Sequence, residues 1–240
     1  MRHNPPTVDA MDESRIELAR SGPVDAVSVP DVPDVSARWY LEVVEQAAAS
    51  AGYAQSFAAF ATEAALGCFA VLFAVVWWRA RHGSREAQHR AYLAPVVTVL
   101  AYLVSEGVKV AWREDRPCRA LGEVTTIVPC PEVGDWSFPS NHATIAGAAA
   151  VAVLWSSRAL GASAVAAALL TGASRVFVGV HYPHDVVAGL LLGSAVAALL
   201  PVLARLTIGL APPGSGVHVG HTATGPANPP PEEPEQSLPC

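Results

Sequence analysis

Residues 174–185, SRVFVGVHYPHD, concentrate ionisable side chains between two long apolar stretches. A histidine can act as a nucleophile when neutral or as a proton donor when charged, so His181 is a candidate for chemistry. Asp185 follows His181 by four residues. On a helical turn this spacing lets the carboxylate accept a hydrogen bond from the imidazole and fix its tautomer. The segment therefore predicts a histidine–aspartate pair, with a second histidine, His142, available from another segment.

The other candidate residues are mostly cations, which suit a multivalent anion because a guanidinium binds two oxygens at once and an ammonium adds a point charge. These cations are Lys109, Arg113, Arg116, Arg119 and Arg175. Two helix starts are expected nearby, one at Pro139–Asn141 and one at Pro183, and helix N-termini favour phosphate. The set predicts a phosphate site. No Cys, His or carboxylate set has metal-ligand spacing, so we expect no catalytic metal.

Long apolar runs must position these residues. The chain is 52% hydrophobic and 15% charged, and its apolar residues cluster in stretches long enough to cross a bilayer core of ~30 Å. Five such runs are expected to span, at 57–78, 91–110, 142–157, 159–178 and 186–204. Residues 36–56 carry Glu42 and Glu45, which favour a helix in the membrane interface over a sixth span. The predicted fold is an all-α integral membrane bundle of five transmembrane helices, or six if 36–56 also crosses.

The candidate residues stand at the ends of these runs. Lys109 ends the second run, His142 begins the third, Arg175 ends the fourth, and the His181–Asp185 segment begins the fifth. Ionisable residues at membrane depth are costly and mark functional sites. Segments distant in sequence therefore converge on one rim of the membrane domain, predicted at 57–206.

Arginines indicate which rim this is. Residues 79–90 hold Arg79, Arg81, Arg85 and Arg90, which predicts that this loop is cytoplasmic. The candidate site would then face the extracytoplasmic side of the plasma membrane. Cys118 and Cys130 lie in the long outer loop, where they are either free thiols or, as the compartment favours, a disulfide.

Both ends of the chain differ in composition from the membrane domain. Residues 1–35 are acidic and residues 207–240 are rich in proline, as in NPPPEEPEQ. Neither segment can bury enough apolar surface to offset its ordering entropy, so both are predicted to be disordered.

Three motifs together resemble the signature of the type 2 phosphatidic acid phosphatase superfamily, in its membrane branch. They are KVAWREDRP at 109–117, PSNH at 139–142 and SRVFVGVHYPHD at 174–185. The order and the spacing of the residues match the family's Lys-x6-Arg-Pro, Pro-Ser-Gly-His and Ser-Arg-x5-His-x3-Asp. Asn141 is the one departure, since the family has glycine there, and its side chain would either crowd the phosphate or contact it.

The resemblance implies a role for each matching residue. His181 would be the nucleophile that forms a phosphohistidine, Asp185 its orienting partner, and His142 the general acid that protonates the leaving oxygen. The phosphate would be bound by Lys109, Arg116, Ser140, the backbone N–H of Asn141 and Arg175. No metal or other cofactor is implied.

The implied activity is hydrolysis of a membrane lipid phosphate or diphosphate within the bilayer, with no nucleic acid as partner. A polyprenyl diphosphate carrier such as undecaprenyl diphosphate is the leading substrate, followed by phosphatidic acid or phosphatidylglycerol phosphate. Two alternatives stay open: a lipid phosphotransferase with the same intermediate, and a non-catalytic protein that binds anionic lipids. The oligomeric state is not predicted.

Residues outside the motifs receive simpler explanations. Glu106 stands three residues before Lys109 and is expected to pair with it. Glu63 is expected to face a cavity of the bundle, and His184 to support the site or contact solvent. Tyr182 and Trp136 are expected to anchor the membrane interface.

Overall fold

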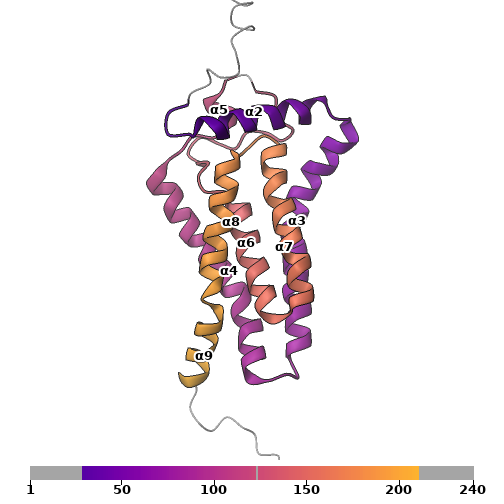
Figure 1. The fold of residues 1–240 in the computed structure, drawn as a ribbon, viewed down its shortest axis with the longest axis vertical. Coiled ribbons are helices and arrows are strands. Elements are labelled where there is room, and N and C mark those ends of the chain that lie inside the picture. The colour runs from indigo at the N-terminus through magenta and orange to yellow at the C-terminus, as the bar shows by residue number, and fades with distance from the viewer. Residues whose placement is uncertain (1–28, 123, 211–240) are drawn as a thin grey trace, which may run out of the picture. The chain divides into compact units, whose positions relative to one another are not determined.

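The computed structural model describes residues 29–122 and 124–210, and in these ranges it contains helices and no strand. The helices are α2 (Asp34–Ala49), α3 (Gly52–Ala80), α4 (Arg85–Trp112), α5 (Pro117–Ala120), α6 (Asn141–Ser156), α7 (Arg158–Phe177), α8 (Pro183–Ala198) and α9 (Leu200–Leu210) (Figure 1). The all-α prediction is confirmed. The segments predicted to be disordered lie mostly outside the described residues, although α2 already begins at Asp34 and α9 continues to Leu210.

Four helical stretches of the described chain are long and apolar enough to cross a membrane: Gly52–Ala80, Arg85–Ala120, Arg158–Phe177 and Pro183–Gly209. The third predicted run forms α6, which has only 16 residues. At 1.5 Å per residue it reaches about 24 Å, short of the ~30 Å core. More than half of its residues are buried, because α6 is the central helix and packs against α4, α7 and α8 (Figure 1).

Close packing between α6 and α8 depends on glycine. A Cβ added at Gly193 would lie 2.0 Å from the Thr144 carbonyl oxygen, and one added at Gly189 would lie 2.5 Å from that of Ser140. The two backbones therefore approach each other without intervening side chains, as small residues permit in membrane helices. This contact fixes the relative height of the helix starts that carry His142 and Asp185.

The helix α2 lies across one end of the bundle (Figure 1). Its buried face is formed by Ala37, Tyr40, Val44 and Ala47, while Glu42 and Glu45 point away and are exposed. Tyr40 is fully buried, and its hydroxyl donates to the Gly179 carbonyl oxygen at 2.9 Å, which attaches α2 to the turn after α7. The placement of α2 at a membrane interface stays a prediction. We call the end of the bundle that α2 covers the site end.

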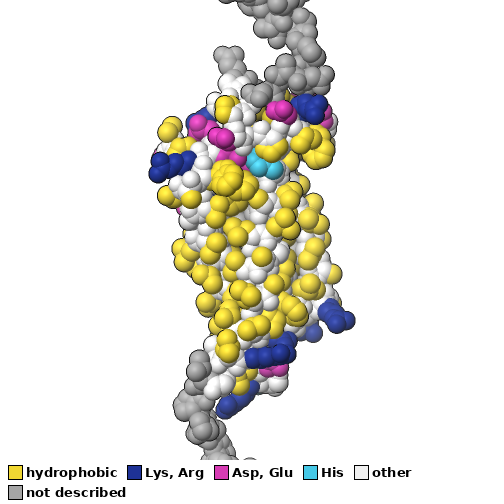
Figure 2. All heavy atoms as spheres, turned by 60° about the vertical axis from the view of Figure 1, so that its left-hand side comes forward, with side chains coloured by type: hydrophobic (Ala, Val, Ile, Leu, Met, Phe, Trp, Pro, Cys, Tyr) yellow, Lys and Arg dark blue, Asp and Glu magenta, His cyan; other side chains and the backbone are white. Residues whose placement is uncertain are grey.

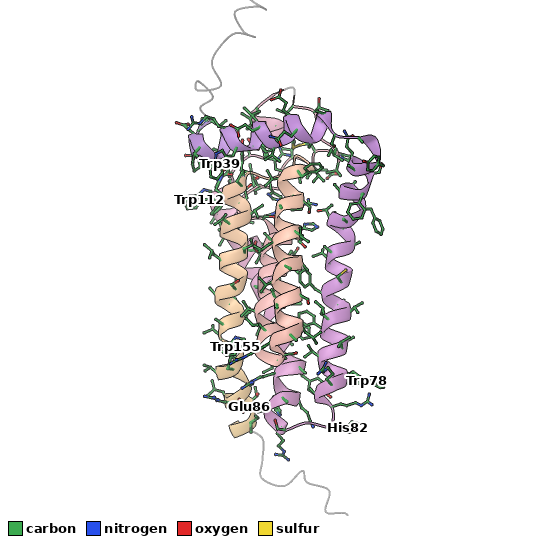
Figure 3. All side chains as sticks on the ribbon, turned by 45° about the vertical axis from the view of Figure 1, so that its right-hand side comes forward. Trp39, Trp78, His82, Glu86, Trp112 and Trp155 are labelled. Carbon is green, nitrogen blue, oxygen red and sulfur yellow. A yellow bond between two sulfur atoms is a disulfide. The ribbon has the colours of Figure 1, made fainter. Side chains whose placement is uncertain are left out.

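The outer surface suits a bilayer. Figure 2 shows a broad apolar surface on the face in view, with charged side chains gathered at its two ends. Trp39 and Trp112 lie toward the site end, and Trp78 and Trp155 lie toward the other (Figure 3). Tryptophan prefers membrane–water interfaces, so the two groups are typical of a protein that crosses the membrane.

Candidate active site

The histidine–aspartate pair lies in the turn between α7 and α8. Gly179, with φ of +88°, lets the chain reverse after α7, and Pro183 begins α8. His181 Nδ1 lies 3.2 Å from Asp185 Oδ2, which also accepts from the Tyr182 backbone N–H at 2.8 Å and from Ser137 Oγ at 2.5 Å. Asp185 therefore caps the start of α8 and orients the imidazole with the same oxygen.

The environment of His181 favours the neutral imidazole. Only 2% of His181 is exposed. Burial lowers the pKa of His181 well below its usual value, and the charges of Arg116, Arg175 and Lys109 lower it further. With the Nδ1 proton donated to Asp185, the lone pair of Nε2 faces Arg116 Nη1 at 3.0 Å. This is the tautomer that a histidine nucleophile requires.

Arg116 and Lys109 share one carboxylate, that of Asp135. Asp135 Oδ1 accepts from Arg116 Nη2 at 2.9 Å and from Lys109 Nζ at 3.1 Å. Partial burial would raise the pKa of Asp135, but the hydrogen bonds and charges of Arg116 and Lys109 outweigh it and hold the pKa below its usual value. The two cations thus share one anionic partner within the protein. Their binding of a substrate phosphate stays a prediction. Asp135 itself was not predicted, because nothing in its loop marks one acid among several.

Arg175 and His142 meet on the α3 side of the site. Arg175 Nη1 donates to Thr62 Oγ1 at 3.0 Å and lies 3.5 Å from Glu63 Oε1. The same Glu63 oxygen lies 3.6 Å from His142 Nε2. Arg175 Nε, Ser140 Oγ and His142 Nε2 are buried and have no hydrogen-bond partner among the described residues, so donors remain available for a ligand oxygen. The sequence patterns predicted neither the contact of Thr62 with Arg175 nor those of Glu63 with Arg175 and His142, because α3 carries no motif.

The side chain of Asn141, the one departure from the signature, forms hydrogen bonds to α4. Its Oδ1 accepts from Ser105 Oγ at 2.8 Å, and its Nδ2 donates to the Glu106 carboxylate. Both partners belong to α4, so the amide fastens α6 to α4. Glu106 also lies 3.9 Å from Lys109 Nζ, which is the expected ion pair.

The turn also holds a hydrogen-bonded network next to Asp185, formed by Glu114, His184 and Ser36. His184 Nε2 lies 3.1 Å from Glu114 Oε2 and 3.3 Å from Asp185 Oδ1, and His184 Nδ1 lies 2.8 Å from Ser36 Oγ. Ligand atoms of Glu114, His184 and Asp185 fall within 4.8 Å of one another. The imidazole between two carboxylates accounts for this grouping as a hydrogen-bonded network that supports Asp185.

Two other expectations have clear outcomes. Tyr182 does not anchor the interface: it is fully buried and packs edge-on against Tyr40, because α2 covers it. Cys118 and Cys130 form a disulfide. The same loop is held further by Arg119, whose Nη1 donates to the Pro131 carbonyl oxygen at 2.7 Å. Arg119 thus supports the loop that presents Asp135.

Comparison with known proteins agrees with these motifs. Residues 90–207 match the family model described as the PAP2 superfamily. The chain is 33% identical over 145 residues to the undecaprenyl-diphosphatase BcrC of Bacillus subtilis, covering 60% of this chain and 69% of BcrC. It is 37% identical over 102 residues to an undecaprenyl-diphosphatase of Sulfolobus acidocaldarius, covering 42% and 48%. It is 42% identical over 83 residues to a lipid A 1-phosphatase of Rhizobium etli, covering 32% and 35%.

Two crystal structures share the fold. One is the first transmembrane PAP2 type phosphatidylglycerolphosphate phosphatase from Bacillus subtilis, with a TM-score of 0.54 and 17% identity, covering 82% of this chain and 96% of that one. The other is Aquifex aeolicus LpxE, with a TM-score of 0.55 and 22% identity, covering 72% and 98%. The chain therefore belongs to the PAP2 superfamily and is an integral membrane hydrolase of phosphoric esters.

Proposed function

We propose that the protein dephosphorylates a lipid phosphate or diphosphate through a phosphohistidine on His181, with a polyprenyl diphosphate as the leading substrate. The observation that carries the mechanism is the buried His181, held by Asp185 at Nδ1 and facing the guanidinium of Arg116 at Nε2. A buried neutral imidazole beside a cation pair is suited to attack a bound phosphate.

The reaction takes two steps. In the first, His181 Nε2 forms a bond to phosphorus, the bond from phosphorus to the leaving oxygen breaks, and His142 gives its proton to that oxygen. In the second, water attacks phosphorus, the nitrogen–phosphorus bond breaks, and His142 takes a proton from the water. Free phosphate leaves and both histidines return to their starting states. Asp185 stays ionised and offsets the positive charge that develops on His181.

Binding of phosphate in this scheme requires the Asp135 carboxylate to move away from Lys109 and Arg116. Its carboxylate accepts from Lys109 and Arg116, and these are the donors that a phosphate would use. The Asp135 side chain is 48% exposed, so it can move outward. Arg175 Nε and Ser140 Oγ supply further donors that have no protein partner.

A groove of about 620 Å³ between α3 and α7 supports a lipid substrate. Its walls are almost entirely apolar, with Phe57, Phe60 and Leu170 among them. Ser174 also lines the groove and donates to Thr62 Oγ1 at 3.0 Å, and Thr62 in turn accepts from Arg175. A hydrocarbon chain in the groove would therefore bring its phosphate to Arg175.

The choice of substrate and the side of the membrane rest on two further observations. The relatives that align over the longest stretches are named undecaprenyl-diphosphatases, which favours a polyprenyl diphosphate. The four arginines of residues 79–90 lie at the end of α3, in the turn after it and at the start of α4, at the end of the bundle opposite the site (Figure 1). By the positive-inside rule the site would face the extracytoplasmic side of the plasma membrane.

Phosphate release from the purified full chain in detergent with EDTA tests the proposal. Undecaprenyl diphosphate, phosphatidic acid and phosphatidylglycerol phosphate are compared side by side. We expect release to be fastest from undecaprenyl diphosphate, to be abolished by His181→Ala, and to persist in Glu45→Gln, an exposed position on α2. Equal release from wild type and His181→Ala would contradict the mechanism. Transfer of phosphate to an added alcohol, with no free phosphate, would indicate a phosphotransferase.

A further inference from the structure

We infer that Glu63 is a positioning residue that favours the protonated form of His142 for its proton transfer to the leaving oxygen. This inference rests on the proposed function, because it requires His142 to be the general acid. Glu63 belongs to α3, outside the three motifs of the family, and its position in the fold rather than a sequence pattern brings it to the site.

The geometry places one carboxylate oxygen between two cationic groups. Glu63 Oε1 lies 3.6 Å from His142 Nε2 and 3.5 Å from Arg175 Nη1. At 3.6 Å the contact with His142 is an ion pair across space rather than a hydrogen bond. His142 Nε2 therefore keeps its proton free for a substrate oxygen while the charge of Glu63 acts on the ring.

The surroundings of His142 explain why a nearby carboxylate is needed to favour its protonated form. An acid must carry its proton before it can give it, yet burial opposes a positive charge on His142, and so do the guanidinium groups of Arg175 and Arg116. Glu63 is the carboxylate whose charge favours the imidazolium there. His181 is held neutral by burial and by the same cations, so it adds no charge of its own.

The other charged groups on the helices around α6 are paired elsewhere. On α4, Lys109 lies beside Glu106 and Asp135. On α8, Asp185 is directed to His181 and His184. Glu63 is thus the carboxylate that remains for His142 among the ion pairs of the described residues.

The catalytic cycle gives this ion pair a defined role. The imidazolium gives its proton to the leaving oxygen in the first step and regains one from water in the second. Glu63 takes no part in these proton transfers, and its carboxylate beside the ring favours reloading of His142 after each turnover. Because it touches neither phosphorus nor the transferred oxygen in this scheme, it acts through His142.

A structural role through Arg175 is the competing explanation. The neighbouring Thr62 allows the two roles to be separated, because its Oγ1 accepts from Arg175 Nη1 at 3.0 Å and no contact ties it to His142. Thr62→Val removes the acceptor of Arg175 and Ser174 and leaves the surroundings of His142 unchanged, whereas Glu63→Gln removes the charge beside both Arg175 and His142. The Glu63 side chain is 69% exposed, so the glutamine variant keeps the fold.

The test compares kcat and KM across pH for wild type, Glu63→Gln, Glu63→Asp and Thr62→Val. General acids contribute ~10²–10⁴-fold, and we expect Glu63→Gln to lose roughly tenfold in kcat on phosphatidic acid at neutral pH. Its alkaline limb should move to lower pH. The loss on p-nitrophenyl phosphate, whose leaving group needs no proton, should be under about threefold. Glu63→Asp should recover most of the rate, and Thr62→Val should raise KM without moving the pH profile.

The outcomes distinguish a failure of the role inferred for Glu63 from a failure of the proposed function. An unshifted pH profile in Glu63→Gln, or an equal loss on both substrates, would overturn the role of Glu63 while the wild type stays active. A wild type that releases no phosphate, or one that is insensitive to His142→Ala, would instead overturn the proposed function. Glu45→Gln serves as the matched loss of an exposed carboxylate on α2 and should behave as wild type.

Discussion

The two sides of the bundle beneath the site are built differently. Between α6 and α8, glycines bring the backbones into direct contact, and a Cβ at Gly193 would lie 2.0 Å from the Thr144 carbonyl oxygen. Between α3 and α7 an apolar groove of about 620 Å³ remains open. The closed side carries His142 and Asp185 at its helix starts, and the open side carries Glu63 and Arg175.

The difference matches the demands of the two tasks. Groups that transfer phosphate and protons must be held within a fraction of an ångström, which a close helix contact provides. A lipid chain has no fixed shape, so the side that receives it needs apolar surface rather than exact fit. The close contact between α6 and α8 and the open groove meet where His142 faces Glu63, at 3.6 Å.

The largest expected effect comes from forcing apart the close contact between α6 and α8, which we call the closed seam. Gly193→Leu forces a side chain against the backbone of α6, and overpacking of a tight contact costs about 3 kcal/mol or more. We expect little folded protein, measured as monodisperse yield and thermal unfolding in detergent. Gly67→Leu on α3 is the matched control, because a Cβ there meets nothing within 4 Å. A Gly193→Leu protein that unfolds at the wild-type temperature would refute the rigid seam.

A smaller, selective effect is expected from filling the groove. Leu170→Trp adds bulk where α7 lines the groove. We expect roughly tenfold lower kcat/KM on long-chain lipid phosphates, equivalent to about 1.4 kcal/mol, with little change on a short-chain, water-soluble analogue. Leu191→Trp, at an exposed position of α8 outside the groove, should leave both rates unchanged. Equal losses on both substrates would show that the chain binds elsewhere.

The closed side was largely predictable from the sequence. The relation of His181 to Asp185 is a spacing of four residues within one turn, and Pro183 marks the helix start beside them. The long apolar runs predicted the helices of the bundle. The run at 142–157 forms α6, but its central position in the bundle could not be predicted, because an apolar run looks alike whether lipid or protein surrounds it.

The partners of the motif residues could not be found in this way. Glu63 and Thr62 belong to α3, more than a hundred residues before Arg175, and only tertiary packing brings them together. Ser137 and Asp135 lie in a loop without periodicity, where one polar residue looks like another. The burial of Tyr182 could not be predicted either, because no sequence pattern indicates that α2 covers it.

The smallest expected effect concerns Asp135, which joins its loop to Lys109 and Arg116. Removing its charge in Asp135→Asn frees Lys109 and Arg116 from a competing anion. We expect KM for lipid phosphate, and the inhibition constant for inorganic phosphate, to fall about threefold, which is about 0.6 kcal/mol.

Steady-state kinetics on the purified protein measure both constants, with Glu132→Gln, an exposed acid of the same loop, as the control. Asp135 also accepts two of the hydrogen bonds that orient Arg116, one through its carboxylate and one through its carbonyl oxygen. The carbonyl contact survives the substitution, so Arg116 keeps its place and the change should appear in KM more than in kcat. A rise in KM would mean that the carboxylate holds Arg116 in position for the substrate instead of competing with it, and Asp135 would then belong with the rigid groups of the closed side.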